Sequence, residues 1–76
     1  MIRFPFNGRE CYANVYTHDS RLKEYHVHII GSELHSELPA KIVLVAVDGQ
    51  MHLADPLNLS KVVLQLVIER IRENQN

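Results

Sequence analysis

Two histidines separated by one residue, His26 and His28, come closest to a chemical site in this chain. They lie in the segment KEYHVHII, whose alternation of polar and apolar residues is typical of a β-strand. Alternate side chains of a strand project from one face about 7 Å apart, so both imidazoles could bind one metal ion. Two ligands do not complete a metal site. The simpler interpretation is that both histidines face solvent on the wet side of an amphipathic strand.

Further ligands would have to come from other segments of the chain. His52 would join the pair if its strand presents it on the same side of the sheet. Glu24, His18 or His35 would then supply a fourth group. Because nothing in the sequence requires these residues to converge, we predict no metal centre and no cofactor, and retain the histidines as candidate ligand-binding residues.

The string EYHVHII also resembles the histidine-triad strand of nucleotide hydrolases, in which a third histidine follows two residues later and completes catalysis. Ile30 occupies that position here. The resemblance is confined to this one strand. It implies no hydrolase activity for this chain, because the third histidine is absent.

Tyr12 and Tyr16 form a second candidate group, on the same predicted face as the two histidines. Exposed aromatic rings on a sheet can stack on the bases of single-stranded RNA or DNA, with basic residues contacting the phosphates. Here eight Lys and Arg stand against nine Asp and Glu, for a formal net charge of −1. This balance disfavours nucleic acid as a partner. Packing between neighbouring strands is the favoured explanation of the tyrosines.

No catalytic group can be assigned from the sequence. Cys11, the only cysteine, is expected on the core face of its strand as a small buried hydrophobe. The three glycines form no phosphate-binding loop. A single cysteine, no membrane-length apolar run and no signal-peptide pattern together lead us to expect a cytoplasmic, non-enzymatic protein.

Two dipeptides, Asn7-Gly8 and Asp48-Gly49, are strong signals for two-residue hairpin turns. Each turn fixes which residues of its two strands face each other. The predicted pairs are Ile2 with Ala13, Phe4 with Cys11, Leu44 with Leu53, and Val45 with His52. Pro5 cannot donate a main-chain hydrogen bond, so the first strand should lie at an edge of the sheet.

A third hairpin is predicted between these two, with a three-residue loop at Asp19–Arg21. This register places apolar residues opposite one another. The predicted pairs are Val15 with Tyr25, Ala13 with Val27, and Cys11 with Ile29. A four-residue loop would instead turn both histidines into the core, because a slip by one residue exchanges the two faces.

The remaining segments complete an α+β domain that spans residues 1–76. The spacing of residues in SELHSEL favours a short helical turn capped by Ser32, with a structured loop as the alternative. A C-terminal helix is expected from about residue 57 to residue 73, opened by Asp55-Pro56 or capped by Asn58. We therefore predict a mainly antiparallel five-stranded sheet of three hairpins, with one helix packed across one face.

The helical segment Leu59–Ile71 carries more apolar surface than one small core requires. At about 100° per residue it presents two adjacent apolar sectors. The first contains Leu59, Val62, Val63 and Leu66, and the second contains Leu64, Val67, Ile68 and Ile71. We expect the first sector to cover the sheet and the second to contact a partner.

An apolar row on the far face of the sheet is also left without a cover. The predicted interface residues are Val43, Val45, Leu64, Val67, Ile68 and Ile71. We predict a small interaction module that forms a homodimer or binds another protein, with no membrane contact. The alternatives are a ligand- or metal-binding module and a single-strand binder. The residues that would serve those alternatives are Tyr12, Tyr16, His26, His28 and His52.

Overall fold

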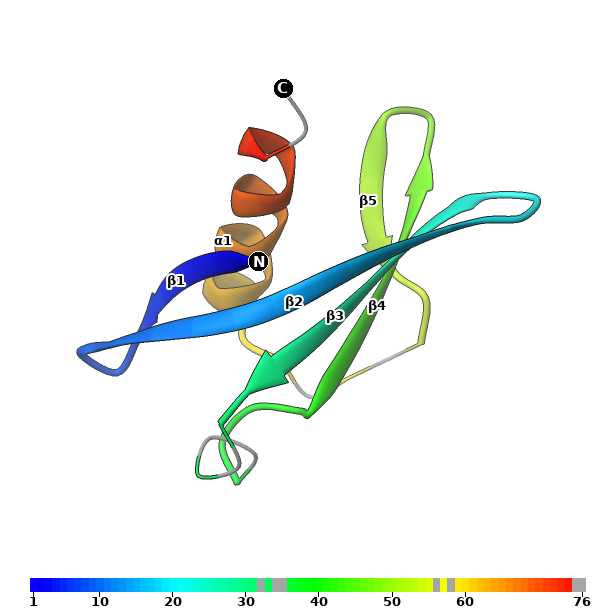
Figure 1. Cartoon of the computed structure of the whole chain (residues 1–76). Coiled ribbons are helices and arrows are strands. Elements are labelled where there is room, and N and C mark those ends of the chain that lie inside the picture. The colour runs from blue at the N-terminus through cyan, green and yellow to red at the C-terminus, as the bar shows by residue number, and fades with distance from the viewer. Residues whose placement is uncertain (32, 34–35, 56, 58, 75–76) are drawn as a thin grey trace.

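The computed structural model describes residues 1–31, 33, 36–55, 57 and 59–74. Its elements are β1 (Ile2–Phe6), β2 (Arg9–Asp19), β3 (Lys23–Ile30), β4 (Lys41–Val47), β5 (Gln50–Leu53) and α1 (Lys61–Glu73). The strands form one antiparallel sheet in the order β1-β2-β3-β4-β5, and α1 lies against one side of it (Figure 1). The predicted α+β class and the edge position of β1 are confirmed.

Tight turns at both ends of the sheet set the register of the first and last hairpins. Asn7 and Gly8 have φ angles of 51° and 74°, and Asp48 and Gly49 have 51° and 79°. Positive φ at both central residues is the signature of a type I′ turn, whose twist matches that of the flanking strands. All the pairs predicted for these two hairpins are confirmed: Ile2 with Ala13, Phe4 with Cys11, Leu44 with Leu53, and Val45 with His52.

The register predicted for the middle hairpin is wrong by two residues. Val15 pairs with Val27 rather than with Tyr25, and the strand pairing continues as far as Asp19 opposite Lys23. The loop is closed at Ser20, whose main-chain N–H and hydroxyl both donate to the carbonyl oxygen of Leu22 at 3.4 Å. Because a shift of two residues preserves the alternation of a strand, the predicted faces are still correct.

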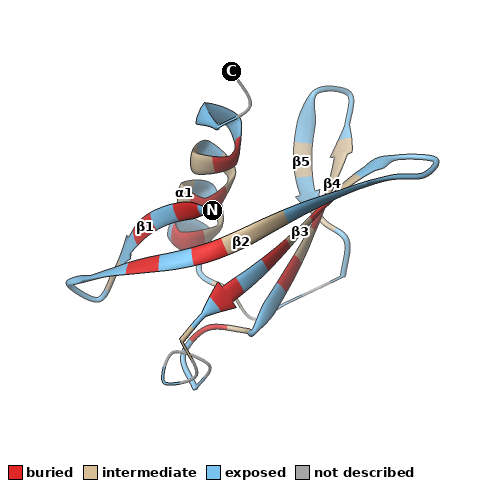
Figure 2. Ribbon diagram, in the orientation of Figure 1, coloured by how far each residue is buried: buried red, intermediate tan, exposed pale blue. Residues whose placement is uncertain are grey.

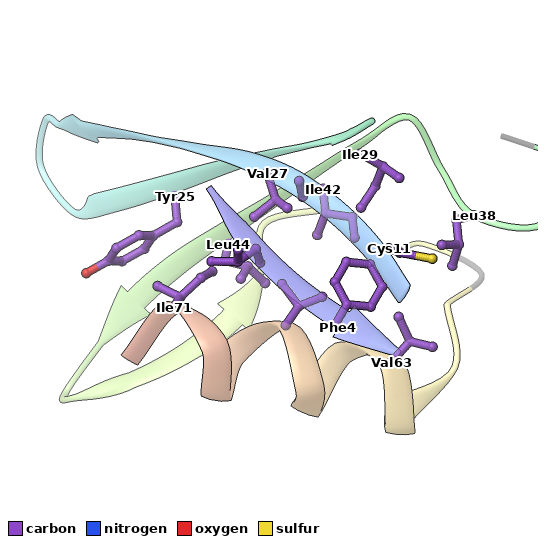
Figure 3. Packing of buried hydrophobic residues seen from close by; sticks show 13 residues of the cluster. Phe4, Cys11, Tyr25, Val27, Ile29, Leu38, Ile42, Leu44, Val63 and Ile71 are labelled. Carbon is purple, nitrogen blue, oxygen red and sulfur yellow. The ribbon is translucent and has the colours of Figure 1, made fainter. Parts of the chain in front are cut away.

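One face of the sheet, here called the inner face, packs against α1 to form the core. Buried and exposed residues alternate along the strands, and the buried side of α1 faces the sheet (Figure 2). Side chains from both layers meet between them (Figure 3). The buried core residues are Ile2, Phe4, Cys11, Ala13, Tyr25, Val27, Ile29, Leu38, Ile42, Leu44, Val63, Val67 and Ile71.

The helix begins four residues later than expected. Ser60 is its N-cap, and the Ser60 hydroxyl accepts a hydrogen bond from the main-chain N–H of Val62 at 3.2 Å. A side-chain acceptor at this position satisfies an N–H that the helix itself leaves unpaired. Asp55 therefore does not cap α1. The predictions for Ser32, His35, Pro56 and Asn58 lie outside the described residues.

Two of the residues predicted to contact a partner belong to the core instead. Val67 is fully buried and Ile71 is 3% exposed, so their assignment to a partner interface is wrong. With Val63 they recur at a spacing of four, which places all three on one line along the helix. The buried face of α1 therefore combines residues of both predicted sectors. Val62, which was expected to cover the sheet, is 66% exposed, so that expectation is also wrong.

Two arginines show which way the sides of α1 face. The Nε of Arg70 donates to the carbonyl oxygen of Arg3 in β1 at 2.9 Å. A guanidinium N–H of Arg72 donates to the carbonyl oxygen of Gly49, in the β4–β5 turn, at 3.3 Å. Residues four apart share a side of a helix, so Leu66 lies with Arg70 on the side toward β1.

By the same spacing, Leu64 and Ile68 lie with Arg72 on the side toward β5. We call this pair the β5-side flank. Both residues are partly buried and pack against the edge of the core. Within the described part of the chain no helix has the length and apolarity that crossing a membrane requires.

Candidate functional site

The face of the sheet opposite α1, here called the outer face, carries every residue predicted to bind a ligand. The register places Tyr16 beside His26 and His26 beside Val43. Alternation then assigns the neighbouring positions to the same side. The outer face comprises Arg3, Pro5, Glu10, Tyr12, Asn14, Tyr16, His18, Glu24, His26, His28, Ile30, Lys41, Val43, Val45, Val47, Gln50 and His52.

The histidines of the outer face contact their neighbours. Nε2 of His26 lies 2.9 Å from a carboxylate oxygen of Glu24, and both side chains are partly buried. The ring of His28 meets that of Tyr16 edge to face, with centroids 5.1 Å apart. The ring of His18 approaches that of His26 in a similar arrangement at 6.4 Å. These contacts leave a shallow depression of about 490 Å³ over β2 and β3.

His52 does not converge with the β3 histidines, although all three share the outer face. His52 pairs with Val45, and Val45 in turn pairs with Glu24. Two strand spacings therefore separate His52 from β3, or about 10 Å. Among the described residues, no group of three or more His, Cys, Asp or Glu side chains could hold a metal ion.

Charge on the outer face is mixed. The Nε of Arg3, which pairs with Tyr12 across the strands, lies 3.5 Å from a carboxylate oxygen of Glu10. Lys41 pairs with His28 at the other end of the face. An acidic group therefore accompanies the basic one beside Tyr12, and the face has no continuous basic track of the kind that follows a phosphate backbone.

Apolar and aromatic side chains lie among the polar ones that the outer face exposes. Val43 and Val45, both predicted to contact a partner, are half-buried there. Tyr12, Tyr16 and Val47 are exposed. Ile30 is 44% exposed and was missed by our sequence analysis. Continuing the alternation of His26 and His28 by one more step would have found it.

A second hollow, of about 660 Å³, lies between β1 and the C-terminal end of α1 and was not predicted from the sequence. Arg3, Arg9 and Arg70 contribute to its lining, but Glu10 and Glu73 lie among them. Arg3 contacts Glu10, and Arg70 contacts Glu73 at 3.4 Å. Because the two glutamates offset most of this positive charge, we assign no anion site to the hollow.

The thiol of Cys11 lies in the core, as predicted. Burial raises the pKa of the Cys11 thiol, and Glu33 raises it further, while the positive charge of Arg9 opposes both. A raised thiol pKa reduces the fraction of the reactive thiolate. The structure therefore gives Cys11 a packing role.

Comparison of the chain with protein-family models, with curated proteins and with solved structures finds no match.

Proposed function

We propose that this protein is a small non-enzymatic interaction module that associates with a second copy of itself. The observation that carries the proposal is a set of apolar and aromatic side chains on the outer face that no described helix or strand covers. Its exposed or half-buried members are Tyr12, Tyr16, Ile30, Val43, Val45 and Val47. A cytoplasmic location is part of the proposal and is supported by the single, free thiol.

The energetics of burial favour a partner. Removing apolar surface from water contributes roughly 25 cal/mol per Å². Soluble monomers rarely expose contiguous apolar patches larger than a few hundred Å² without a function. A domain of 76 residues also has a small core of its own, so a subunit contact would add a large fraction of its net stability.

The β5-side flank supports the same conclusion on the helical side of the sheet. Leu64 and Ile68 remain only partly buried although they border the core. They were predicted to contact a partner and, unlike Val67 and Ile71, they retain apolar surface for one. A partner located near β5 could reach both this flank and Val45 on the outer face, because β4 and β5 are neighbours.

The test is the solution mass of the full chain as a function of concentration. Sedimentation equilibrium at high micromolar concentration should give twice the 8.8 kDa of a single chain. On dilution the dimer should dissociate to monomers, and a single dissociation constant should describe the masses at all concentrations. A mass that stays at that of one chain throughout would contradict the proposal.

Single-stranded nucleic acid is a second candidate, favoured by the 55% exposure of Tyr16 on the same face as Tyr12. If these rings serve to stack bases, the free protein should have the mass of a single chain. Fluorescence anisotropy with labelled oligothymidylate tests it. Binding that weakens steeply with added salt and is lost in Tyr16→Ala would support this candidate over self-association.

A further inference from the structure

The two edges of the sheet differ in what they offer to another strand. Phe6 and Arg9 flank the two-residue turn of the first hairpin, so they exchange main-chain hydrogen bonds. Hydrogen-bonded and non-hydrogen-bonded pairs alternate along the strands, so the main-chain groups of Arg3 and Pro5 point away from β2. Pro5 has no N–H to donate. The carbonyl oxygen of Arg3 already accepts from Arg70. The β1 edge is therefore largely closed to strand addition.

Among the described residues, no strand pairs with the free edge of β5. The N–H of Ala54 donates to the carbonyl oxygen of Val43 at 2.9 Å, which fixes the hydrogen-bonding phase of the last hairpin. Alternation then directs the N–H and C=O groups of Met51 and Leu53 away from β4. No strand of the described chain lies on that side of β5. Both residues are only half-buried, so their apolar side chains are available beside these free groups.

We propose that the β5 edge pairs antiparallel with the β5 edge of a second copy, so that one sheet runs through both chains. This inference rests on the self-association proposed above and names the contact that produces it. An antiparallel edge is self-complementary about a two-fold axis, because each copy presents the same donors and acceptors in opposite order. The register that uses all the outward groups places Met51 opposite Leu53 of the second copy.

This register brings side chains of the two copies together on both sides of the sheet. On the inner side, Met51 and Leu53 of both copies meet beside the β5-side flanks of Leu64 and Ile68. On the outer side, His52 faces His52 of the second copy across the axis. The interface thus includes the helical residues that were predicted from the sequence, Leu64 and Ile68, whereas Val43 and Val45 lie on β4, one strand in from the paired edge.

One open edge also explains why the assembly should stop at two chains. If both edges were free, β1 of one copy could pair with β5 of the next and a filament would grow. Closure of β1 by Pro5 and Arg70 prevents that head-to-tail contact. The expected assembly is a closed dimer.

Disulfide trapping tests the register in the full-length chain. In His52→Cys the two thiols would face each other at a non-hydrogen-bonded pair, with Cα atoms about 4.5 Å apart, which suits a disulfide. In the matched control Gln50→Cys, the corresponding Cα atoms would lie roughly 14 Å apart along the strands, beyond reach. Cys11 is buried and leaves both experiments undisturbed.

Mild oxidation of His52→Cys should give a covalent dimer in high yield, while Gln50→Cys should stay uncrosslinked. Equal crosslinking of the two variants would indicate random collision and overturn the β5 pairing. If neither crosslinks while the unmodified chain has the mass of a dimer, self-association stands and the β5 interface is wrong. A monomeric mass for the unmodified chain would overturn both proposals.

A proline variant provides an independent check. Met51→Pro removes an N–H that points away from β4, so it leaves the ladder within the chain intact. The dimer dissociation constant should rise at least tenfold, with the far-ultraviolet circular dichroism unchanged. An unchanged dissociation constant in a folded variant would contradict the β5 pairing. If this variant fails to fold, the crosslinking pair decides.

Discussion

The Nε of Arg70 donates to the main-chain carbonyl oxygen of Arg3 at 2.9 Å, although the two residues lie 67 positions apart in the sequence. This hydrogen bond attaches the last turns of α1 to the edge strand β1. It also occupies an acceptor that β1 would otherwise offer to another strand. A single arginine thus contributes both to the stability of the domain and to the asymmetry between its two sheet edges.

Replacing Arg70 with methionine should therefore lower the free energy of unfolding. Methionine keeps much of the apolar stem of arginine but removes the charged donor. A hydrogen bond from a charged donor contributes about 1 to 2 kcal/mol to the free energy of unfolding. Urea denaturation monitored by circular dichroism measures the change. Arg21→Met, at an exposed loop position, is the matched control and should change stability by less than about 0.5 kcal/mol. Equal effects of the two substitutions would argue against the Arg70 contact.

A glutamate should have very different effects on stability at two positions of α1. Ile71→Glu places a carboxylate in the core and should cost about 3 kcal/mol or more, enough to unfold much of a small domain. Val62→Glu, at a residue that is 66% exposed, should leave the melting temperature nearly unchanged. A folded Ile71→Glu protein with wild-type stability would show that this residue is not part of the core.

The β5-side flank should control assembly more than folding. Ile68→Glu introduces like charges on both sides of the proposed interface, where a partly buried carboxylate costs more than on an open surface. We expect the dissociation constant to rise at least tenfold, as measured by sedimentation, with the chain still folded. Val62→Glu again serves as the control, because its side chain lies away from this flank. Dissociation by both variants alike would point to a general charge effect.

Native Cys11 should react slowly with a thiol reagent and rapidly once urea unfolds the chain. Only 2% of the residue is exposed, and burial keeps the thiol protonated. In a Cys11→Ala background, Ser20→Cys provides an exposed thiol at the β2–β3 loop for comparison. Equally fast labelling of native Cys11 and the Ser20→Cys thiol would contradict the buried position.

The same thiol gives stability a defined pH dependence. Its pKa is raised above the ordinary value of 9.0, so the unfolded chain loses this proton at a lower pH than the folded one. The Cys11 contribution to stability is therefore fully present below that value and is lost as pH rises through the folded-state pKa. Urea midpoints measured at about pH 8 and pH 10 should fall more in the wild type than in Cys11→Ala.

The parts of the fold that the sequence predicts best are those with a specific turn signature. Asn7-Gly8 and Asp48-Gly49 each adopt positive φ at both positions, and this requirement fixes the two hairpins residue by residue. The loop at Ser20–Leu22 contains no such pair. For the two strands that this loop joins, periodicity predicted which residues share a face of the sheet. It could not distinguish registers that differ by two residues.

The helix shows a second limit of sequence periodicity. Spacing gives the angle between two side chains but not the direction in which the sheet lies. Val67 and Ile71 were assigned to a partner on that basis, whereas the sheet covers them. The position of Arg70 and Arg72, each bonded to a different end of the sheet, supplied the missing orientation.

For the candidate site, alternation along each strand correctly grouped Tyr16, His26 and His28 on one face. It could not give the distance of His52 from this group, because strand order is a tertiary property. Nor could it predict that His26 would contact Glu24, since rotamers decide that pair. The free β5 edge likewise required both the strand order and the hydrogen-bonding phase.

The order of the strands in the sheet is the order of the strands in the chain, and this has a kinetic consequence. Every strand finds its partner in the segment that immediately precedes or follows it, so each hairpin closes only a short loop and carries a small entropic penalty. The docking of α1 on β1 joins the two most distant parts of the polypeptide and should come last. We therefore expect the hairpins to form rapidly, followed by a slower step in which the helix packs on the sheet and excludes water from the core.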